Sequence, residues 1–257
     1  MLGLGASIVK GGALAWTPIE LGSTLLAWYQ YNTGQTNLSG TDGNADNEMK
    51  WADQSGGSRH ATQRADGDKP TFTAGYVDFE DTSVSDHLEI QAGDGAMDFG
   101  YDSGTPANGT CTIIVALSRE SADGNDRILG GAGTEFISFV NNTTAVQTRA
   151  AGTQSTNTFA ADTWPTDEKL ILTYTKDGNG NQLFYKNDGA VLTPDSQSGD
   201  NPLVGTDMDL LVLGSMTTGN TVSAFDGKIY EVIICDTVLS DDDRQNAQKY
   251  IMSKIGI

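Results

Sequence analysis

The amino-acid sequence predicts an all-β protein, an antiparallel β-sandwich with a Gly-rich N-terminal arm and one C-terminal helix. Apolar residues make up 37% of the 257 residues, and 31 glycines are scattered among short runs rich in Val, Ile, Tyr and Phe. Clusters of Gly, Asn, Asp and Ser separate these runs at short intervals. Runs of this length between turn-forming clusters are typical of sandwich strands. A helical pattern is clear only near the end of the chain.

The expected strands follow one another from Leu25 onward. In order they are LLAWYQY, GYVDF, HLEI, TIIVAL, RILGG, EFISFV, AVQTRA, LILTYT, QLFYKN, LLVLG and KIYEVIICD. Two hairpins are predicted between consecutive runs. The segment KDGNGN, at 176–181, has Asp-Gly and Asn-Gly steps that tolerate the positive φ angles of tight turns. The segment FVNNTTAV, at 139–146, indicates the second hairpin.

The helix is predicted in LSDDDRQNAQKYIMSKIGI, at 239–257. Ser240 is a favourable N-cap, three aspartates follow it where the helix dipole favours carboxylates, and lysines lie toward the other end. Ala247 and Ile251 share one face with Tyr250 beside it. This narrow apolar stripe predicts that the helix lies on the sandwich.

The chain divides into an arm, residues 1–20, and one domain, residues 21–257. The arm has no helical or strand period, and Trp16 and Pro18 near its end could anchor it. Its first residues do not match a secretory signal well, because no cationic segment precedes the apolar part and Lys10 interrupts it. We therefore expect the arm to serve in docking or assembly.

Charge excludes two classes of partner. Lys and Arg total 15 against 34 Asp and Glu, so the formal net charge is -19, which repels phosphate backbones and anionic lipids. Neither nucleic acid nor a membrane is an expected partner, and the longest apolar runs fall short of the roughly 18 residues that a spanning helix requires. Cys111 and Cys235 each lie in an apolar run, where we expect them to be buried and reduced.

Four blocks of the sequence share an order with a known type of domain. They are LLAWYQYNTG, WADQSGGSRHATQ, KPTF with YVDFEDTSVSDHLEI, and FDGKIYEVIICDTVLSDDDRQNAQKYI. This order resembles the laminin G-like type of concanavalin A-like jelly-roll domain, which is common in bacterial and bacteriophage surface proteins. The resemblance covers most of residues 25–257 and implies a jelly-roll fold. On their own chemistry, Trp51 and Phe79 are expected in the core, and Asp53 and Ser55 in a local turn.

The sequence contains no recognisable catalytic set. Retaining glycosidases need two carboxyls about 5 Å apart, whereas the odd interval between Glu231 and Asp236 predicts opposite faces of a strand. Asp86 and Glu89 lie in turn-like sequence and are interpreted as solvated surface. The two histidines accompany no nucleophile or metal motif. We predict that the protein is not an enzyme, with glycoside hydrolysis as a less favoured alternative.

Calcium is the candidate cofactor. Asp42, Asn44 and Asp46 stand at alternate positions of one loop, which is how a tight loop directs several oxygens at one hard cation. The loop is not an EF-hand, because Asn47 replaces the glycine and Asp53 the glutamate of that pattern. A solvated Asx-rich loop without metal is the alternative interpretation.

Glycan recognition by such folds uses exposed aromatic rings with Asn or Asp groups on loops. Tyr29, Tyr31, Tyr101 and Trp164 are the candidates. Tyr29 and Tyr31 alternate on an expected strand and therefore share a face, which is either the core or a binding surface. The sequence leaves this choice open.

The leading hypothesis is a bacteriophage structural protein, located in the virion and displayed on the particle surface as capsid decoration or a tail-associated protein. Its expected partners are other virion proteins or copies of itself, bound through the arm, together with cell-surface glycans bound in the manner of a lectin. The alternative is a free-standing bacterial carbohydrate-binding module. Both hypotheses rest on fold-level analogy.

Overall fold

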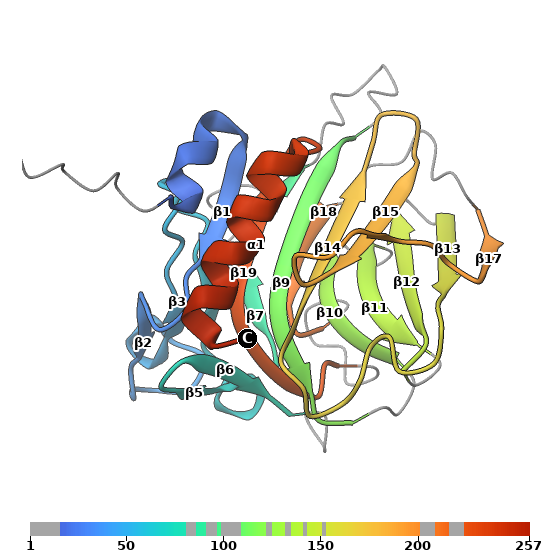
Figure 1. Ribbon diagram of the computed structural model, residues 1–257. Helices are drawn as coiled ribbons and strands as arrows, with labels where there is room; N and C mark the ends of the chain where they lie inside the picture. The colour runs from blue at the N-terminus through green and yellow to red at the C-terminus, as the bar shows by residue number, and fades with distance from the viewer. Residues whose placement is uncertain are drawn as a thin grey trace, which may run out of the picture.

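The computed structural model describes residues 16–80, 86–90, 97–98, 109–121, 125–131, 135–140, 143–150, 153–200, 209–215 and 224–257. Within these ranges the chain forms two antiparallel β-sheets packed face to face, with one α-helix on the outside (Figure 1). This architecture confirms the predicted all-β sandwich with one C-terminal helix. Residues 1–15 of the predicted arm lie outside the described ranges.

Sheet A has eight strands, and the helix lies on its outer face. The order across the sheet is β16 (Val191–Leu192), β15 (Gln182–Lys186), β14 (Leu170–Lys176), β9 (Cys111–Arg119), β19 (Gly227–Cys235), β6 (Tyr76–Phe79) and β5 (Thr71–Thr73), with β1 (Leu25–Tyr29) also paired to β19. The β14–β15 pair is the hairpin predicted around KDGNGN, with Lys176 opposite Gln182.

Sheet B has eleven strands. The order is β17 (Ser196–Gly199), β13 (Thr153–Thr158), β12 (Ala145–Ala150), β11 (Phe136–Val140), β10 (Asn125–Gly131), β18 (Asp209–Leu213), β7 (Leu88–Ile90), β4 (Ala61–Gln63), β3 (Met49–Trp51) and β2 (Gln35–Asn37), with β8 (Met97–Asp98) paired to β18. The predicted hairpin of FVNNTTAV is the β11–β12 pair, in which Val140 lies opposite Ala145.

The core lies between the sheets, and the large aromatic residues fill it. Trp51, Phe79 and Trp164 are completely buried there. All nine residues of β9 are buried, because a strand covered on both faces has no solvent-facing positions. Ile113 and Val115 point into the layer between the sheets, while Ile114 points to the helix. This double burial explains the uninterrupted apolar run in the sequence.

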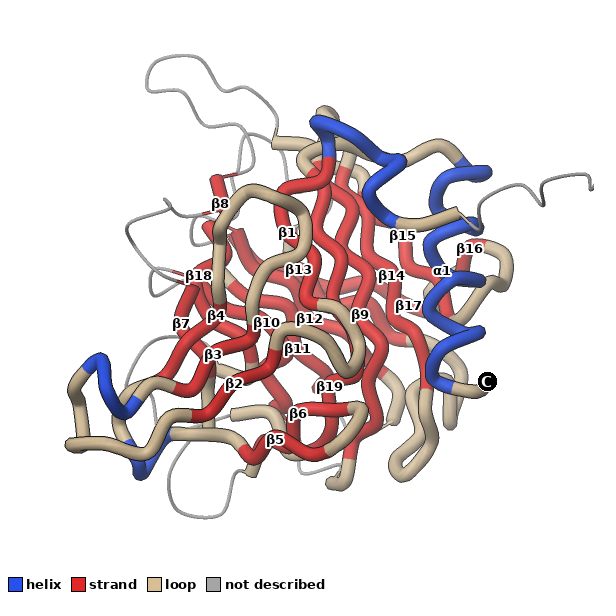
Figure 2. Tube along the Cα trace, turned by 90° about the vertical axis from the view of Figure 1, so that its left-hand side faces the viewer, coloured by secondary structure: helices blue, strands red, loops and turns tan. Residues whose placement is uncertain are grey.

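Helix α1 (Asp241–Ile255) covers the outer face of sheet A (Figure 2). The Ser240 hydroxyl accepts a hydrogen bond from the Asp243 amide, as predicted for an N-cap. Gly256 ends the helix in the left-handed conformation. Ala247, Ile251 and neighbouring apolar residues pack on the sheet. The helix and its apolar stripe were predicted correctly.

Short 3-10 segments accompany the sheets: η1 (Pro18–Thr24), η2 (Ala45–Asn47) and η3 (Asp66–Asp68). Trp16 and Leu21, at the base of the predicted arm, pack with the apolar layer under α1. The Trp16 and Tyr250 ring centroids are 6.1 Å apart. The base of the arm is therefore attached to the helix side of the molecule.

Asp53 organises a turn between β3 and β4, as predicted. Its Oδ1 accepts hydrogen bonds from the amides of Trp28, at 2.9 Å, and Ser55, at 2.8 Å, and its Oδ2 accepts one from the Arg59 amide. Gly227 has φ 146°, and a side chain there would meet the Ser118 carbonyl oxygen at 2.3 Å. Both residues serve the fold.

Cys111 and Cys235 are buried and free, as expected. Register places Cys235 opposite Thr112, and Cys111 faces the layer between the sheets while Cys235 faces the helix. The two thiols therefore point to opposite faces of sheet A. Within the described ranges, no helix is both long and apolar enough to cross a membrane.

Candidate functional site

The outer face of sheet B carries polar side chains over β10–β13 and β17. Ile137, Phe139 and Val146 point into the core, so the alternate residues of β11 and β12 point outward. Antiparallel register aligns these outward residues in rows across the sheet. We call this surface the polar face; it consists of Arg127, Phe136, Ser138, Gln147, Arg149, Gln154, Thr156 and Ser198.

The middle row of the polar face crosses five strands. Arg127 lies opposite Ser138, Ser138 opposite Gln147, Gln147 opposite Thr156, and Thr156 opposite Ser198. The Gln147 amide accepts from Arg127 Nη1 at 3.5 Å and donates to Thr156 Oγ1 at 3.0 Å. Arg127, Gln147 and Thr156 are partly buried, and Ser198 is exposed. Ser138 is completely buried, and its hydroxyl donates to the Phe139 carbonyl oxygen, so the donors and acceptors that solvent reaches are those of the other four residues.

The neighbouring row holds an aromatic ring between two arginines. Phe136 lies opposite Gly130 on one side and Arg149 on the other. The Arg127 guanidinium carbon lies 3.5 Å from the Phe136 ring centroid, and the ring is only 1% exposed. Burial, with the nearby positive charge of Arg149, lowers the pKa of Arg127 to about 10. The pair is therefore a concentrated, partly desolvated positive charge.

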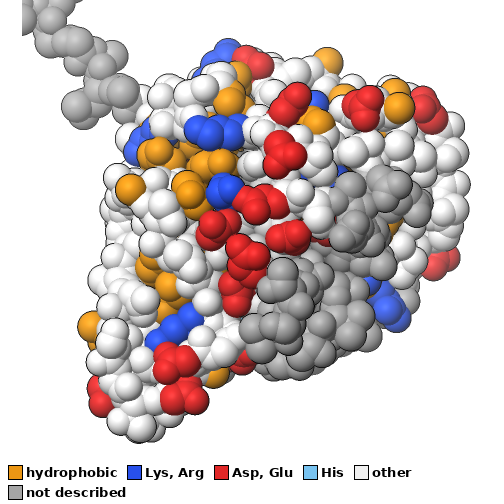
Figure 3. Space-filling view, turned by 90° about the horizontal axis from the view of Figure 1, so that it is seen from below, with side chains coloured by type: hydrophobic (Ala, Val, Ile, Leu, Met, Phe, Trp, Pro, Cys, Tyr) orange, Lys and Arg blue, Asp and Glu red, His pale blue; other side chains and the backbone are white. Residues whose placement is uncertain are grey.

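Acidic side chains form a second cluster, at the end of sheet A. Carboxylate oxygens of Asp78, Glu80 and Glu120 lie within 4.8 Å of one another, and Figure 3 shows acidic side chains gathering on the face seen from below. Lys228 forms an ion pair with Glu120. Burial raises the pKa of Asp78 and of Glu80, and neighbouring carboxylates add to the effect. Three such carboxylates could hold a divalent cation, in competition with Lys228.

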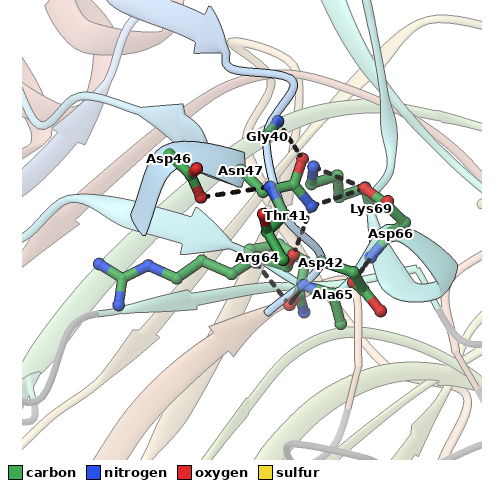
Figure 4. Close-up of polar contacts among 10 residues, drawn as sticks. Gly40, Thr41, Asp42, Asp46, Asn47, Arg64, Ala65, Asp66 and Lys69 are labelled. Atoms are coloured by element: carbon green, nitrogen blue, oxygen red, sulfur yellow. Dashed lines mark hydrogen bonds and ion pairs between the residues drawn. The ribbon is translucent and has the colours of Figure 1, made fainter. Parts of the chain in front are cut away.

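The predicted calcium ligands direct their side chains to backbone amides. Asp42 Oδ1 accepts a hydrogen bond from the Asp66 amide at 2.8 Å, and Asp46 Oδ1 accepts one from the Thr41 amide at 3.2 Å. Figure 4 shows these contacts. Asn44 contributes its backbone to the turn, donating to Thr41 and accepting from Asn47. Calcium binding by Asp42, Asn44 and Asp46 stays a prediction.

Asn47 holds this loop together, and the sequence did not single it out for that role. Its side chain is buried, and Nδ2 donates to the Arg64 carbonyl oxygen at 2.9 Å and to Asp66 Oδ1 at 2.8 Å. Its Oδ1 accepts from the Gly40 amide, and Lys69 pairs with Asp66 (Figure 4). An amide that bridges three backbone or carboxylate partners orders the loop by itself.

Two of the four aromatic candidates for glycan stacking are buried, and a third is partly buried. Tyr29 and Trp164 are completely buried in the core, and Tyr31 packs against the layer under α1. Strand β1 ends at Tyr29, so the alternation that would place Tyr31 on the same face does not continue. Tyr101 lies outside the described residues.

Two carboxyls that the sequence did not mark as special are buried. Glu231 accepts hydrogen bonds from Trp28 Nε1 at 2.7 Å and from the Tyr31 amide at 3.3 Å, and burial raises its pKa to about 7. Burial also raises the pKa of Asp86 to about 7. Asp86 is 6% exposed and accepts from the Glu80 amide, so its interpretation as solvated surface is wrong.

No protein-family model matches the sequence, and no curated protein is similar to it at a significant level. Solved structures do match the fold. Trypanosoma rangeli sialidase in complex with sialic acid covers 94% of this chain at a TM-score of 0.58 and 14% sequence identity. The binding domain of Paraclostridial Mosquitocidal Protein 1 covers 90% of this chain at a TM-score of 0.56 and 11% identity.

The matches cover part of each neighbour, because the chain spans 34% of the sialidase chain and 52% of the toxin domain. They support the sandwich fold that the laminin G-like resemblance implied. Neither protein is a bacteriophage protein, so that part of the resemblance stays a hypothesis.

The prediction that the chain is not an enzyme is contradicted by these matches. It assumed that a sandwich without a recognisable catalytic motif only binds or decorates. Sandwiches of the same fold form part of sialidases, so the fold gives no ground for excluding catalysis.

Sequence reasoning missed Arg127 and Arg149, although it predicted the strands that carry them. The available signal was the alternation within AVQTRA, where Gln147 and Arg149 occupy positions that do not match a buried face. Which face of the strand is buried depends on how the two sheets pack. Only the structure therefore shows that Arg149 lies near Arg127.

Proposed function

We propose that this chain is a carbohydrate-binding domain and that the polar face is its saccharide-binding surface. The observation that carries the proposal is the middle row, in which Arg127, Ser138, Gln147, Thr156 and Ser198 align across five strands. Its guanidinium, amide and hydroxyl groups offer both donors and acceptors at regular spacing.

The chemistry of sugars fits such a row. Each sugar hydroxyl both donates and accepts, so a surface that binds sugars needs both kinds of group in fixed positions. Gln147 is already oriented by Arg127 and Thr156. Side chains held on a rigid sheet lose little further freedom on binding, which favours affinity.

The comparisons are compatible with this proposal. One protein of the same fold is a sialidase in complex with sialic acid, and another is the binding domain of a toxin. The argument for this chain rests on its own polar face.

Titration of the full chain against a panel of neutral and acidic oligosaccharides, by calorimetry, tests the proposal. We expect at least one oligosaccharide to bind, and Gln147→Ala to weaken that binding by about tenfold, because it removes an amide that contacts both sides of the row. Gln245→Ala, on the surface of α1, is the matched control and should leave binding unchanged. Absence of binding across the panel, or equal loss in both variants, would refute the proposal.

A second proposal concerns location: that the domain is displayed on a bacteriophage particle, as capsid decoration or tail-associated protein, with residues 1–20 binding virion proteins or further copies. It is supported by the sequence resemblance and by the packing of Trp16 and η1 beside α1, which fixes the base of the arm. Sedimentation of the full chain beside a variant lacking residues 1–15 tests it. A defined oligomer or particle association of the full chain alone is expected; identical monomers would refute it.

A further inference from the structure

The arginines of this acidic chain fall into two groups. Arg64, Arg119 and Arg244 each pair with a carboxylate, those of Glu48, Asp126 and Asp241 respectively. Arg59, Arg127 and Arg149 form no ion pair with any residue that the structure describes, and of these three, Arg127 and Arg149 are neighbours on the polar face. In a chain with 34 acidic residues, two neighbouring arginines without a carboxylate are an exception that needs a reason.

Both of these arginines also have an unused donor. The Nε atoms of Arg127 and Arg149 are buried and have no hydrogen-bond acceptor among the described residues, as is also true of Arg59 and Arg244; what Arg127 and Arg149 have in addition is each other's positive charge nearby. A buried donor without an acceptor costs free energy, and two cations in contact repel each other. An anion bound between the two guanidinium groups would relieve the repulsion.

We propose that the polar face selects acidic saccharides and that a sugar carboxylate lies between Arg127 and Arg149. This inference rests on the proposed function and adds the chemical class of the ligand. The two guanidinium groups bind the carboxylate, and the row from Gln147 to Ser198 binds hydroxyls of the same sugar or of the next one.

The position of Arg127 suits this role. Its guanidinium lies over the Phe136 ring, 3.5 Å from the centroid, and a guanidinium stacked in this way keeps the N–H groups of its edge free to donate. Arg–carboxylate hydrogen bonds are charge-assisted and often bidentate, which makes them strong and directional. Gly130, opposite Phe136, places no side chain beside the ring.

The charge of the rest of the molecule makes this selection local. With a net charge of -19, most of the surface repels an acidic sugar. A carboxylate is therefore attracted most strongly to the sheet face that carries the two arginines without ion pairs.

The test uses the full chain and pairs of probes that differ in charge alone. The probes are a galacturonate tetrasaccharide and 3′-sialyllactose, each beside its methyl ester, with lactose and lactose 3′-sulfate as further arms. By calorimetry, at least one free acid should bind ten or more times more tightly than its ester. Arg149→Gln and Arg127→Gln should each reduce that preference at least tenfold. Arg64→Gln removes the same charge directly after β4, away from the polar face, and should leave the preference for the free acid unchanged.

The outcomes separate this inference from the proposed function. If an ester or lactose binds as tightly as the acids, and the arginine variants bind like the parent chain, saccharide binding stands but the acidic class is wrong. Binding of lactose 3′-sulfate alone would overturn the carboxylate assignment. If no saccharide binds at all, both proposals fail. Thermal unfolding of each variant verifies that it is folded before its affinity is interpreted.

Discussion

The outer faces of the two sheets have opposite chemistry. On sheet A, outward residues such as Ile114, Ile171 and Ile233 are apolar and lie under α1. On sheet B, the outward residues of β10–β13 and β17 form the polar face. Strand alternation operates in both sheets, so the difference lies in what each face is built to contact.

Polar groups on the two faces also differ in how they are satisfied. Under α1, Gln248 donates to Thr173 Oγ1 at 2.8 Å, and Arg244 stacks over Tyr185 while pairing with Asp241. On the polar face, Arg127 and Arg149 have no carboxylate partner among the described residues, although a buried Nε atom without an acceptor occurs on both faces, in these two arginines and in Arg244. The arginine under α1 is therefore neutralised by a carboxylate of its own chain, whereas the two on the polar face leave their charge for a ligand.

The largest expected effect is on the helix-covered face. Ile251 is completely buried between α1 and sheet A, so Ile251→Ala should lower the free energy of unfolding by about 3 kcal/mol through lost burial and a cavity. Urea denaturation measures the change. Asn246→Ala, on the exposed side of α1, should stay within about 0.5 kcal/mol. Equal effects would mean that the helix does not close this face.

Glu231 provides a pH-dependent test of the same layer. Burial raises the pKa of Glu231 to about 7 in the folded protein, from its ordinary value of 4.5. The folded state therefore binds this proton more tightly than the unfolded state, and stability from this group is full below about pH 4.5 and lost as the pH rises to about 7.

Glu231→Gln should remove that slope and be more stable than the parent chain at pH 8, by about 2 kcal/mol. The measurement is the free energy of unfolding of both proteins from pH 4 to pH 8. The difference isolates Glu231 from Asp86, whose pKa is raised in the same direction. A constant difference across this range would show that Glu231 titrates normally.

A smaller effect is expected at the start of α1. Ser240 Oγ accepts from the Asp243 amide at 3.1 Å, and Ser240→Ala should cost about 1 kcal/mol. Ser253→Ala, in the last turn, is the comparison and should cost less. Thermal unfolding of the two variants is the measurement. Equal lowering of their midpoints would contradict the role of Ser240 as the cap.

The smallest predicted effect, with the opposite sign, belongs to the polar face. Arg149→Gln removes the repulsion of Arg127 and should raise the free energy of unfolding by about 0.5 kcal/mol without ligand. Urea denaturation of the variant and of Arg64→Gln, which breaks an ion pair instead, checks this. A clear loss of stability in Arg149→Gln would place that arginine with the structural residues.

The two faces also differ in how well the sequence predicted them. Every apolar run named from the sequence forms a strand, and α1 begins at its expected cap, Ser240. Strands β13 and β17 were missed because TQSTNT and SQSG have no apolar alternation. Those two strands exist because neighbours pair with their backbones, which local sequence does not encode. The missed strands carry three of the eight residues of the polar face, Gln154, Thr156 and Ser198.

The position of β19 has a consequence for how the chain folds. This strand lies between β9 and both β1 and β6, although it comes after almost all of the other strands in the sequence. During synthesis, more than a hundred residues are added after β9 before its neighbour β19 leaves the ribosome. Contacts between segments so distant in sequence form slowly, and until then the apolar strand β9 is exposed to aggregation. Sheet A is therefore a structure that the chain completes at the end of translation.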